Sequence, residues 1–290
     1  MSDFKLYKYP MNKNVFVTNE TVLLTPKTFY PNGQIWEFNE IDLFFSKVLS
    51  HPNKAPIIVD IGAQTGLYTL FASFVPDASF YSYEPFVPCY NELNKNIALN
   101  NITNVKTFNI AISDKTEKKM LKVPVHKGLS TFGDNPLRFQ DYKEVEVECD
   151  TLDNIFYEKN ISVDFIKCDT EGWEYFVLLG GLKTIEKYHP VLQLEYHHTN
   201  MSQCGINKQD FDKLIEKIGY VCTVDSGEEH IYEYMSKTFE GSDLCLKNDK
   251  FVLSKFDHVY IDVGLSWNAP NSIEWCKHVP NALVFGFEPN

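Results

Sequence analysis

Carboxylate and imidazole side chains follow two apolar segments in the second half of the chain, at positions where they could do acid–base or metal chemistry. Asp169 and Glu171 come after the first segment, and Glu195, His197 and His198 stand at the end of the second. If these segments are neighbouring parallel strands, the side chains meet at one edge of a sheet, in one cleft. An imidazole that is oriented by a carboxylate can act as a general base on a hydroxyl group near neutral pH. We therefore predict Asp169, Glu195 and His197 as catalytic residues.

The same acids admit two other interpretations. Asp169 and Glu195, with Glu171 or His197 as a further ligand, could hold a divalent ion that lowers the pKa of a bound hydroxyl. Alternatively, Asp169 caps the next helix and Glu171 interacts with the dipole of that helix. Glu171 also stands beside the expected cleft, where we predict that it contacts the substrate. The sequence leaves these alternatives open.

A turn with two glycines in the first third of the chain is suited to a nucleotide-type ligand. Asp60, Gly62 and Gly66 lie between a segment typical of a strand and one typical of a helix, so the backbone can bend tightly at a helix N-terminus. A dinucleotide fingerprint has a middle glycine that admits the pyrophosphate, and this turn lacks it. Glu84 ends the next apolar segment, where a second strand presents a carboxylate to ribose hydroxyls. The pattern favours S-adenosylmethionine, with the turn at its methionine end and Glu84 at its ribose.

Strand-like and helix-like segments alternate through the middle of the chain, which is the pattern of a parallel α/β sheet. The expected core strands are 57–61, 79–83, 105–111, 164–168, 191–196 and 220–224, with an edge strand at 244–246. The expected helices of this region include 89–99 and 173–188, the latter broken near Gly180. Residues 1–50 are expected to form a lead-in with short strands at 15–17 and 22–24 and a helix over 40–49. We therefore predict an α/β fold with a doubly wound, mostly parallel Rossmann-like sheet.

Several blocks of the sequence resemble the FkbM-type S-adenosylmethionine-dependent methyltransferases. They occur in the order of that family over roughly residues 30–250, and the longest are VDIGAQTGLY at 59–68, YEPFVP at 83–88 and VDFIKCDTEG at 163–172. Shorter blocks stand at 93–96, 99–100, 104–105, 111–114, 152–153, 178–181 and 190–195. The resemblance implies a class I methyltransferase domain over residues 51–250 that methylates a hydroxyl of a sugar or glycoconjugate. Ile112, with Ser113 or Asp114, would then lie on the adenine side of the cofactor.

An insertion between two core strands is expected to carry substrate contacts. Residues 120–123 and 145–147 could pair as strands around a loop, and such folds place substrate contacts in long loops at the carboxyl ends of strands. In the resembled family this region lies near the methyl acceptor, so His126, Ser130 and Thr131 are candidate substrate-binding residues. A solvent-exposed hairpin tip is the alternative.

Composition restricts the partners and the compartment. The chain has 290 residues and a net charge of −12 without a basic stripe, which argues against nucleic acid as the main substrate. Base-modifying methyltransferases usually carry a D/N/S-P-P-Y/F/W block, and Asp169-Thr170-Glu171-Gly172 occupies its position here. The seven cysteines include no C-x-x-C pair, so neither zinc nor a disulfide framework is expected. Since neither an apolar run of about 20 residues nor a signal sequence is recognisable, we expect a soluble, cytoplasmic protein without a membrane partner.

Residues 251–290 repeat the layout of the first strand–turn–helix–strand unit. Asp262 and Glu288 stand at the ends of two apolar segments, as Asp60 and Glu84 do. We expect an incomplete second βαβ unit related to the first. Because such a unit cannot bury its own sheet faces, it must pack on the main domain, pair with another chain or remain loosely ordered. We expect a structural appendage, with self-association as one role. Residues 267–270 contain no second glycine, which puts cofactor binding there in doubt.

Two other functions would use similar features. A nicotinamide-dependent oxidoreductase has a comparable sheet, but the missing middle glycine argues against it. A non-catalytic nucleotide-binding or assembly module would account for the incomplete C-terminal unit. The acids and glycines of the first unit are intact, which favours an enzyme.

Overall fold

A computed structural model of the chain describes residues 3–24, 33–35, 37–124, 130–134, 141–235, 245–247, 250–252, 258–263 and 282–287. The chain divides into two compact units, Met1–Met235 and Ser236–Asn290. Within the described residues, every helix is too short or too polar to cross a membrane.

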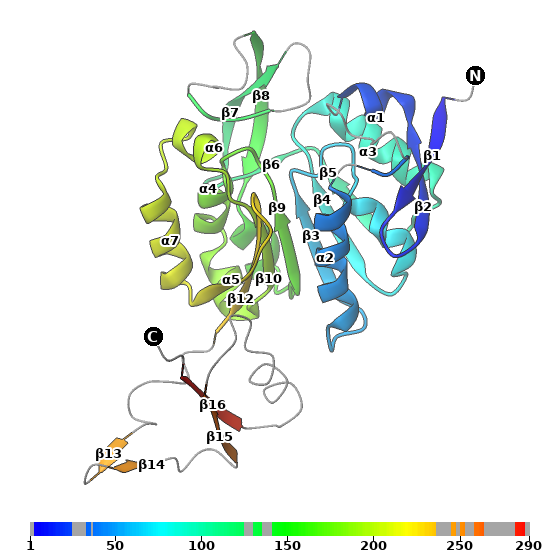
Figure 1. The fold of residues 1–290 in the computed structure, drawn as a ribbon. Coiled ribbons are helices and arrows are strands. Elements are labelled where there is room, and N and C mark those ends of the chain that lie inside the picture. The colour runs from blue at the N-terminus through cyan, green and yellow to red at the C-terminus, as the bar shows by residue number, and fades with distance from the viewer. Residues whose placement is uncertain are drawn as a thin grey trace. The chain divides into compact units, whose positions relative to one another are not determined.

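A seven-stranded sheet lies at the centre of the first unit (Figure 1). Its strands are β3 (Ile57–Ile61), β4 (Ser79–Tyr83), β5 (Val105–Phe108), β9 (Phe165–Cys168), β10 (Val191–Glu195), β11 (Tyr220–Asp225) and β12 (Glu229–Tyr234). They follow the order β11-β12-β10-β9-β3-β4-β5, and β12 is antiparallel to both neighbours while the other pairs are parallel. The chain runs outward from β3 to β5 and returns to β9 on the other side of β3. The prediction of a doubly wound, mostly parallel sheet is therefore confirmed.

Helices cover both faces of this sheet (Figure 1). One side carries α2 (Phe38–Ser50) and α3 (Val87–Leu99), and the other carries α4 (Glu174–Leu179), α5 (Leu182–Tyr188) and α7 (Lys208–Lys217). Adjacent strand residues point to opposite faces, so Ile58 packs in one apolar core with Phe44 of α2, and Val59 packs in the other with Val177 of α4. The predicted helix over 40–49 and the interrupted helix over 173–188 are confirmed. Shorter elements are the 3₁₀ turn η1 (Thr69–Phe74), the π-helical turn η2 (Asp153–Tyr157) and α6 (His198–Gln203).

The lead-in is a hairpin followed by a short helix. Strands β1 (Phe4–Tyr9) and β2 (Lys13–Thr18) pair antiparallel, and α1 (Asn19–Leu24) follows. The prediction of a strand at 15–17 is confirmed, but the prediction of a strand at 22–24 is wrong. Thr18 Oγ1 accepts a hydrogen bond from the Thr21 backbone N–H at 3.2 Å, which caps the first turn of a helix. The cap formed by Thr18 therefore favours a helix over a strand at residues 22–24.

The insertion forms a separate small sheet that extends past the central one (Figure 1). Its strands are β6 (Ala111–Ile112), β7 (Glu117–Pro124) and β8 (Tyr142–Asp150), in the order β6-β8-β7. The predicted pairing of the two long strands is confirmed, since β7 and β8 are antiparallel. The expected strand 105–111 is shorter, because β5 ends at Phe108 and Ala111 belongs to β6. The described residues between Glu117 and Asp150 are called the arm below.

The second unit contains two pairs of strands. β13 (Cys245–Lys247) and β14 (Lys250–Val252) are antiparallel, whereas β15 (His258–Val263) and β16 (Ala282–Phe287) are parallel. Asp262 is paired with Gly286, two residues before Glu288, and Asp60 is paired with Ser82, two residues before Glu84. The two parallel pairs therefore share one register. The prediction of a sheet-edge strand at 244–246 is wrong, because β13 pairs with β14 and β12 lies beside β10.

Candidate active site

A cavity of about 630 Å³ lies at the carboxyl ends of β3, β4, β9 and β10. Its wall is made by the turn after β3, the end of β4, the loop after β9 and the turn between β11 and β12. The arm contributes Leu121, Ser130 and Phe132. The order in which the chain adds strands reverses between β3 and β9, and doubly wound sheets bind ligands at such a position. The cavity is therefore the candidate active site.

The turn after β3 can only be built with glycine at its first position. Gly62 has a φ of +73°, and a Cβ there would lie 1.9 Å from the backbone oxygen of Asp169. The N–H groups of Gly62 and Ala63 both donate to the Tyr83 carbonyl, at 3.1 and 3.0 Å. Gly66, at a φ of +91°, donates to the Ala63 carbonyl at 2.7 Å. Gly62 thus lets the ends of three strands approach one another beneath the cavity.

Glu84 stands at the end of β4 in the cavity wall, as the sequence predicts for a ribose-binding acid. It is 6% exposed, and its two carboxylate oxygens accept the N–H groups of Gln64 at 2.9 Å and Phe86 at 2.8 Å. Burial raises the pKa of Glu84 to about 7, and the two N–H groups oppose that rise. The carboxylate is therefore fixed in position with lone pairs left for a ligand.

Asp60 does not line the cavity, which corrects the expectation that it faces the methionine end of the cofactor. It is 2% exposed and lies behind the wall, where Thr69 Oγ1 donates to its Oδ2 at 2.7 Å. Burial raises the pKa of Asp60, and the charge of Lys167 opposes this. Strand alternation explains the position, because Asp60 shares the face of β3 with Ile58 and points toward η1.

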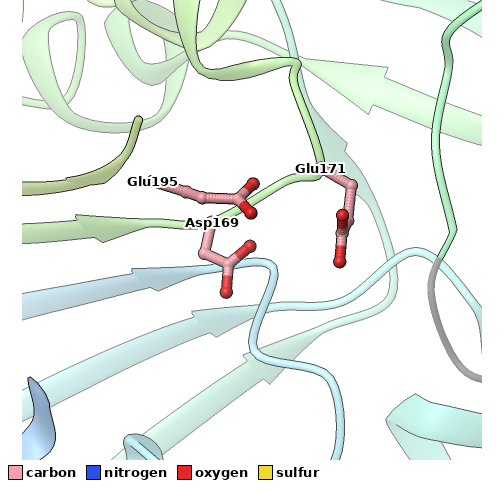
Figure 2. A group of neighbouring side chains, drawn as sticks. All are labelled: Asp169, Glu171 and Glu195. Carbon is pink, nitrogen blue, oxygen red and sulfur yellow. The ribbon is translucent and has the colours of Figure 1, made fainter. Parts of the chain in front are cut away.

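Three carboxylates from two neighbouring strand ends come together in the cavity wall. One oxygen of each of Asp169, Glu171 and Glu195 lies within 4.8 Å of the corresponding oxygens of the other two, and Figure 2 shows these side chains grouped together. Burial, followed by the charges of Asp169 and Glu171, raises the pKa of Glu195. The sequence prediction that Asp169 and Glu195 share a cleft is therefore confirmed, and Glu171 joins them.

The loop that carries Glu171 has an unusual backbone. Glu171 has a φ of +55° and Gly172 a φ of +101°. A Cβ at Gly172 would lie 2.2 Å from the Asn200 carbonyl oxygen, so the loop lies tightly against the start of α6. Thr131 Oγ1 of the arm donates to the Glu171 carbonyl at 2.9 Å. Contacts on both sides thus hold Glu171 in a left-handed conformation that costs free energy, as is found at functional sites.

The interpretation of Asp169 as the cap of the next helix is wrong. The next helix, α4, begins at Glu174 and has no side-chain cap. The carboxylate of Glu174 itself accepts the Thr170 N–H at 2.7 Å and the Thr170 hydroxyl at 2.8 Å. Asn200 Nδ2 instead donates to Glu171 Oε2 at 2.8 Å and to Glu195 Oε1 at 3.2 Å. One amide therefore bridges two of the three carboxylates.

Lys167 is a cavity residue that the site prediction omitted. It is 4% exposed, and its Nζ lies 3.6 Å from Asp169 Oδ2, 3.7 Å from Asp60 Oδ1 and 3.3 Å from the Gly62 carbonyl. Burial disfavours the charge of Lys167, but the charges of Asp169 and Asp60 outweigh burial and raise its pKa. Its ammonium group is therefore a permanent charge rather than a general base. A charged residue in the middle of the apolar strand 164–168 was the sequence signal for it.

His197 does not share the cavity with Asp169 and Glu195, so the predicted convergence of imidazole and carboxylates is wrong. It lines an adjoining hollow of about 420 Å³ together with His198, and Gly227 and Glu228 belong to the linings of both. Its Nδ1 accepts the Asn200 N–H at 3.3 Å, which caps α6, and its Nε2 lies 3.0 Å from Glu228 Oε1. The chain turns into α6 directly after β10, and this turn carries the imidazole away from the strand end.

The predicted adenine-side residues separate into two groups. Ile112 lines the cavity, whereas Ser113 and Asp114 do not. Ser113 Oγ instead accepts the indole N–H of Trp173 at 3.1 Å, and Trp173 lines the cavity. Ser113 therefore orients an apolar wall that the sequence analysis did not include.

The arm brings one of its predicted substrate residues to the cavity. Ser130 lines the cavity, whereas Thr131 is buried behind it and holds Glu171 as described. His126 lies outside the described residues. Phe132, which was not predicted, also lines the cavity and packs against Trp173 with 5.1 Å between ring centroids.

Comparison with known proteins gives one family match that covers most of the first unit. The family model described as the methyltransferase FkbM domain matches residues 60–234. The curated methyltransferase sdnD of Sordaria araneosa is 26% identical over 205 residues, which are 60% of this chain and 76% of that protein.

Among the similar solved structures are two methyltransferases at lower identity. Methyltransferase FkbM from Methylobacillus flagellatus KT is 17% identical, with a TM-score of 0.45 over 66% of this chain and 46% of that chain. This chain thus spans about half the length of that protein. A SAM-dependent methyltransferase from Aquifex aeolicus is 14% identical, with a TM-score of 0.38 over 65% of this chain and 87% of that chain.

Proposed function

Because this chain belongs to the FkbM methyltransferase family and is an S-adenosylmethionine-dependent methyltransferase, we propose that it methylates a hydroxyl group of a sugar or glycoconjugate. The sulfonium of the cofactor is already an activated electrophile. The protein must therefore hold the acceptor oxygen in line with the methyl group and provide for the loss of the hydroxyl proton. The three carboxylates Asp169, Glu171 and Glu195 in the cavity wall are the observation that carries this proposal.

The cavity wall supports one orientation of the cofactor. Glu84 would accept hydrogen bonds from the ribose hydroxyls, and Ile112 with Trp173 would contact the adenine. The methionine end would then lie over the turn after β3 and toward Asp169, so the sulfonium comes near the three carboxylates. Their negative charge suits a positively charged cofactor.

We further propose that Asp169, Glu171 and Glu195 hold a divalent cation such as Mg²⁺. Three carboxylate oxygens within 4.8 Å of one another are hard donors of the kind that Mg²⁺ prefers. Such an ion, when bound, lowers the pKa of a coordinated hydroxyl. The amide of Asn200 bridges Glu171 and Glu195 and sets the separation of their carboxylates. Without a cation, the ionised carboxylate of Glu195 would take the acceptor proton itself, because the rise in its pKa through burial makes that carboxylate a stronger base.

Methyl transfer to a panel of neutral saccharides, followed by mass spectrometry, tests the acceptor class. We expect a methylated product from at least one saccharide, loss of product with a chelator and recovery with Mg²⁺. Glu195→Gln should reduce turnover by about two orders of magnitude or more, the contribution typical of a catalytic group, while cofactor binding persists. Activity that withstands the chelator would exclude the cation and leave Glu195 as the base. Cofactor binding without transfer to any saccharide hydroxyl would exclude the proposed acceptor class.

A further inference from the structure

We propose that Lys167, together with Glu37 and Glu229, binds the zwitterionic amino-acid end of S-adenosylmethionine, with the ammonium of Lys167 on the α-carboxylate and the two acids on the α-ammonium. The proposal rests on the cofactor orientation proposed above. It replaces Asp60, which lies behind the cavity wall, as the recognition group for the methionine end.

Lys167 has unused hydrogen-bonding capacity in the cavity wall. Its ammonium carries three N–H donors, but within the described residues it makes one hydrogen bond, to the Gly62 carbonyl at 3.3 Å. The nearest carboxylate oxygens, on Asp169 and Asp60, lie at 3.6 and 3.7 Å, beyond the usual length of a charge-assisted hydrogen bond. Asp60 Oδ1, which is itself buried, has no hydrogen-bond partner among the described residues. The ammonium also lies over the Tyr68 ring, 4.8 Å from its centroid, so a ligand carboxylate could approach Lys167 more closely than any of these present neighbours except the Gly62 carbonyl.

The charge of Lys167 differs from that of the other charged residues in the cavity lining. Among the described residues that line the cavity it is the one cation, against eight carboxylates. A ligand that brings only a carboxylate would meet Lys167 but also the repulsion of the acids around it. A ligand that carries an ammonium group beside its carboxylate can pair its carboxylate with Lys167 and its ammonium group with the acids. An α-amino acid is the smallest group with that arrangement.

Glu37 and Glu229 are placed to receive the ammonium group. Both line the cavity, and the charges of both act on Lys167 and Tyr68. Glu229 Oε2 accepts one hydrogen bond from Gln193 Nε2 at 2.9 Å, and Gln193 also donates to the Tyr68 hydroxyl at 2.7 Å. The hydrogen bond from the buried Gln193 therefore orients the carboxylate of Glu229. Glu37 precedes α2 in a left-handed conformation, with a φ of 54°.

The arrangement predicts how the cavity discriminates among adenosine compounds. 5′-Methylthioadenosine offers adenine and ribose but no zwitterion, so it should bind weakly. Adenosine phosphates bring negative charge without a compensating ammonium group and should be excluded. S-adenosylhomocysteine carries the complete amino acid and should bind well.

Isothermal titration calorimetry on the full chain tests the assignment with ligands altered at one group. We expect S-adenosylhomocysteine to bind about tenfold more tightly than its decarboxylated analogue, as for one charge-assisted hydrogen bond. Lys167→Met should weaken binding of S-adenosylhomocysteine by a similar factor and leave the decarboxylated analogue unchanged. Lys183→Met, at an exposed lysine outside the cavity lining, is the matched control. Equal binding of the two ligands by the natural chain would overturn the proposal.

A second variant keeps the test independent of folding, since Lys167→Met leaves buried acids unpaired. Glu229→Gln should weaken S-adenosylhomocysteine binding more than it weakens binding of the deaminated analogue. An equal effect of Glu229→Gln on both ligands would contradict the assignment of the α-ammonium. If no adenosine compound binds the natural chain, the proposed cofactor orientation fails instead, and the two failures are thus distinguished.

Discussion

A single buried carboxylate, Glu84, connects cofactor binding to pH. Its pKa is raised from 4.5 to about 7 by burial, and the ionised form is the better acceptor for two ribose hydroxyls. We expect the affinity for S-adenosylhomocysteine to increase as the pH is raised from about 6 to about 8. Calorimetry across this range measures the effect. Glu84→Gln should bind more weakly and without this pH dependence, whereas Glu233→Gln, an ion-pair partner of Lys47 outside the cavity lining, should behave as the natural chain does.

Glu84 also affects the stability of the ligand-free protein. Because folding raises the pKa of this acid, its contribution to stability is fully present below the unfolded pKa and is lost as the pH rises through the folded pKa. The loss therefore extends from about pH 4.5 to about pH 7 and amounts to at most about 3 to 4 kcal/mol, at about 1.4 kcal/mol for each pKa unit. Glu84→Gln should accordingly melt at a higher temperature than the natural chain near pH 8 but not near pH 4.5. Identical melting curves at both pH values would contradict the raised pKa.

Substitution of Gly62 by alanine should destabilise the turn after β3 and disrupt the cavity wall. Gly62→Ala places a Cβ 1.9 Å from a backbone oxygen of the adjacent strand end, whereas Gly205, which also has a positive φ, has no atom within 4 Å of such a Cβ. Both substitutions incur the cost of a left-handed alanine, about 1 kcal/mol. Only Gly62→Ala should also displace Asp169 and abolish cofactor binding. Thermal melts and calorimetry on the two variants separate backbone strain from the steric clash.

Residue type and spacing predicted some of the site and missed the rest for a physical reason. Glu84, Asp169 and Glu195 were found because each stands at the end of a strand, and parallel strand ends meet at one edge. Asp60 and His197 were misplaced because the direction of a side chain at a strand end depends on alternation and on the following turn. Both properties are fixed by tertiary contacts rather than by local sequence.

The arm presents Ser130 and Phe132 to the cavity. Lys122 Nζ on β7 holds the segment behind them, donating to the carbonyls of Gly133 at 2.8 Å and Asp134 at 3.0 Å. Lys122→Met should loosen this wall and raise the KM for the acceptor about three- to tenfold, since each such bond contributes about 1 kcal/mol. The affinity for S-adenosylhomocysteine should stay the same.

Lys118→Met is the matched control for the arm, because Lys118 lies on the same strand and pairs with exposed Glu146 and Glu148. It should leave both constants unchanged. A weakened cofactor affinity in Lys122→Met would show that the arm supports the cofactor rather than the acceptor.

Element types were predictable where hydrophobic periodicity and length agreed, as in α2, the interrupted pair α4 and α5, and the five parallel core strands from β3 to β10. The errors occurred where one short apolar run suits several structures. The run at 22–24 belongs to a helix because Thr18 caps it. The segment Glu229–Tyr234 was not predicted as a strand, because Glu, His and Tyr residues interrupt its apolar pattern; it is nevertheless β12, placed between β10 and β11 by antiparallel pairing on both sides.

At the scale of the whole cavity, the excess of negative charge predicts which acceptors are used. Eight carboxylates and one ammonium line it among the described residues, and like charges brought together in a confined site cost several kcal/mol. A neutral saccharide should therefore be methylated at least about tenfold more efficiently than the corresponding uronic acid or sugar phosphate. Comparison of kcat/KM for such a matched pair at constant ionic strength tests this. A preference for the anionic acceptor would show that the bound cation, rather than the acids, governs recognition.

The division of the chain into two compact units leads to a prediction about the whole molecule. Every described residue that lines the cavity lies between Glu37 and Glu229, within the unit Met1–Met235. A chain that ends at Met235 should therefore bind S-adenosylhomocysteine with unchanged affinity and retain methyl transfer. The pair β15–β16 has the register of β3–β4 but is a sheet of two strands, and a two-stranded sheet leaves both faces and both edges for other structure to cover. If the second unit mediates self-association, as we propose, sedimentation should show a larger species for the full chain than for the shortened one. Equal oligomeric states would exclude that role, and loss of cofactor binding on shortening would show that the second unit supports the site.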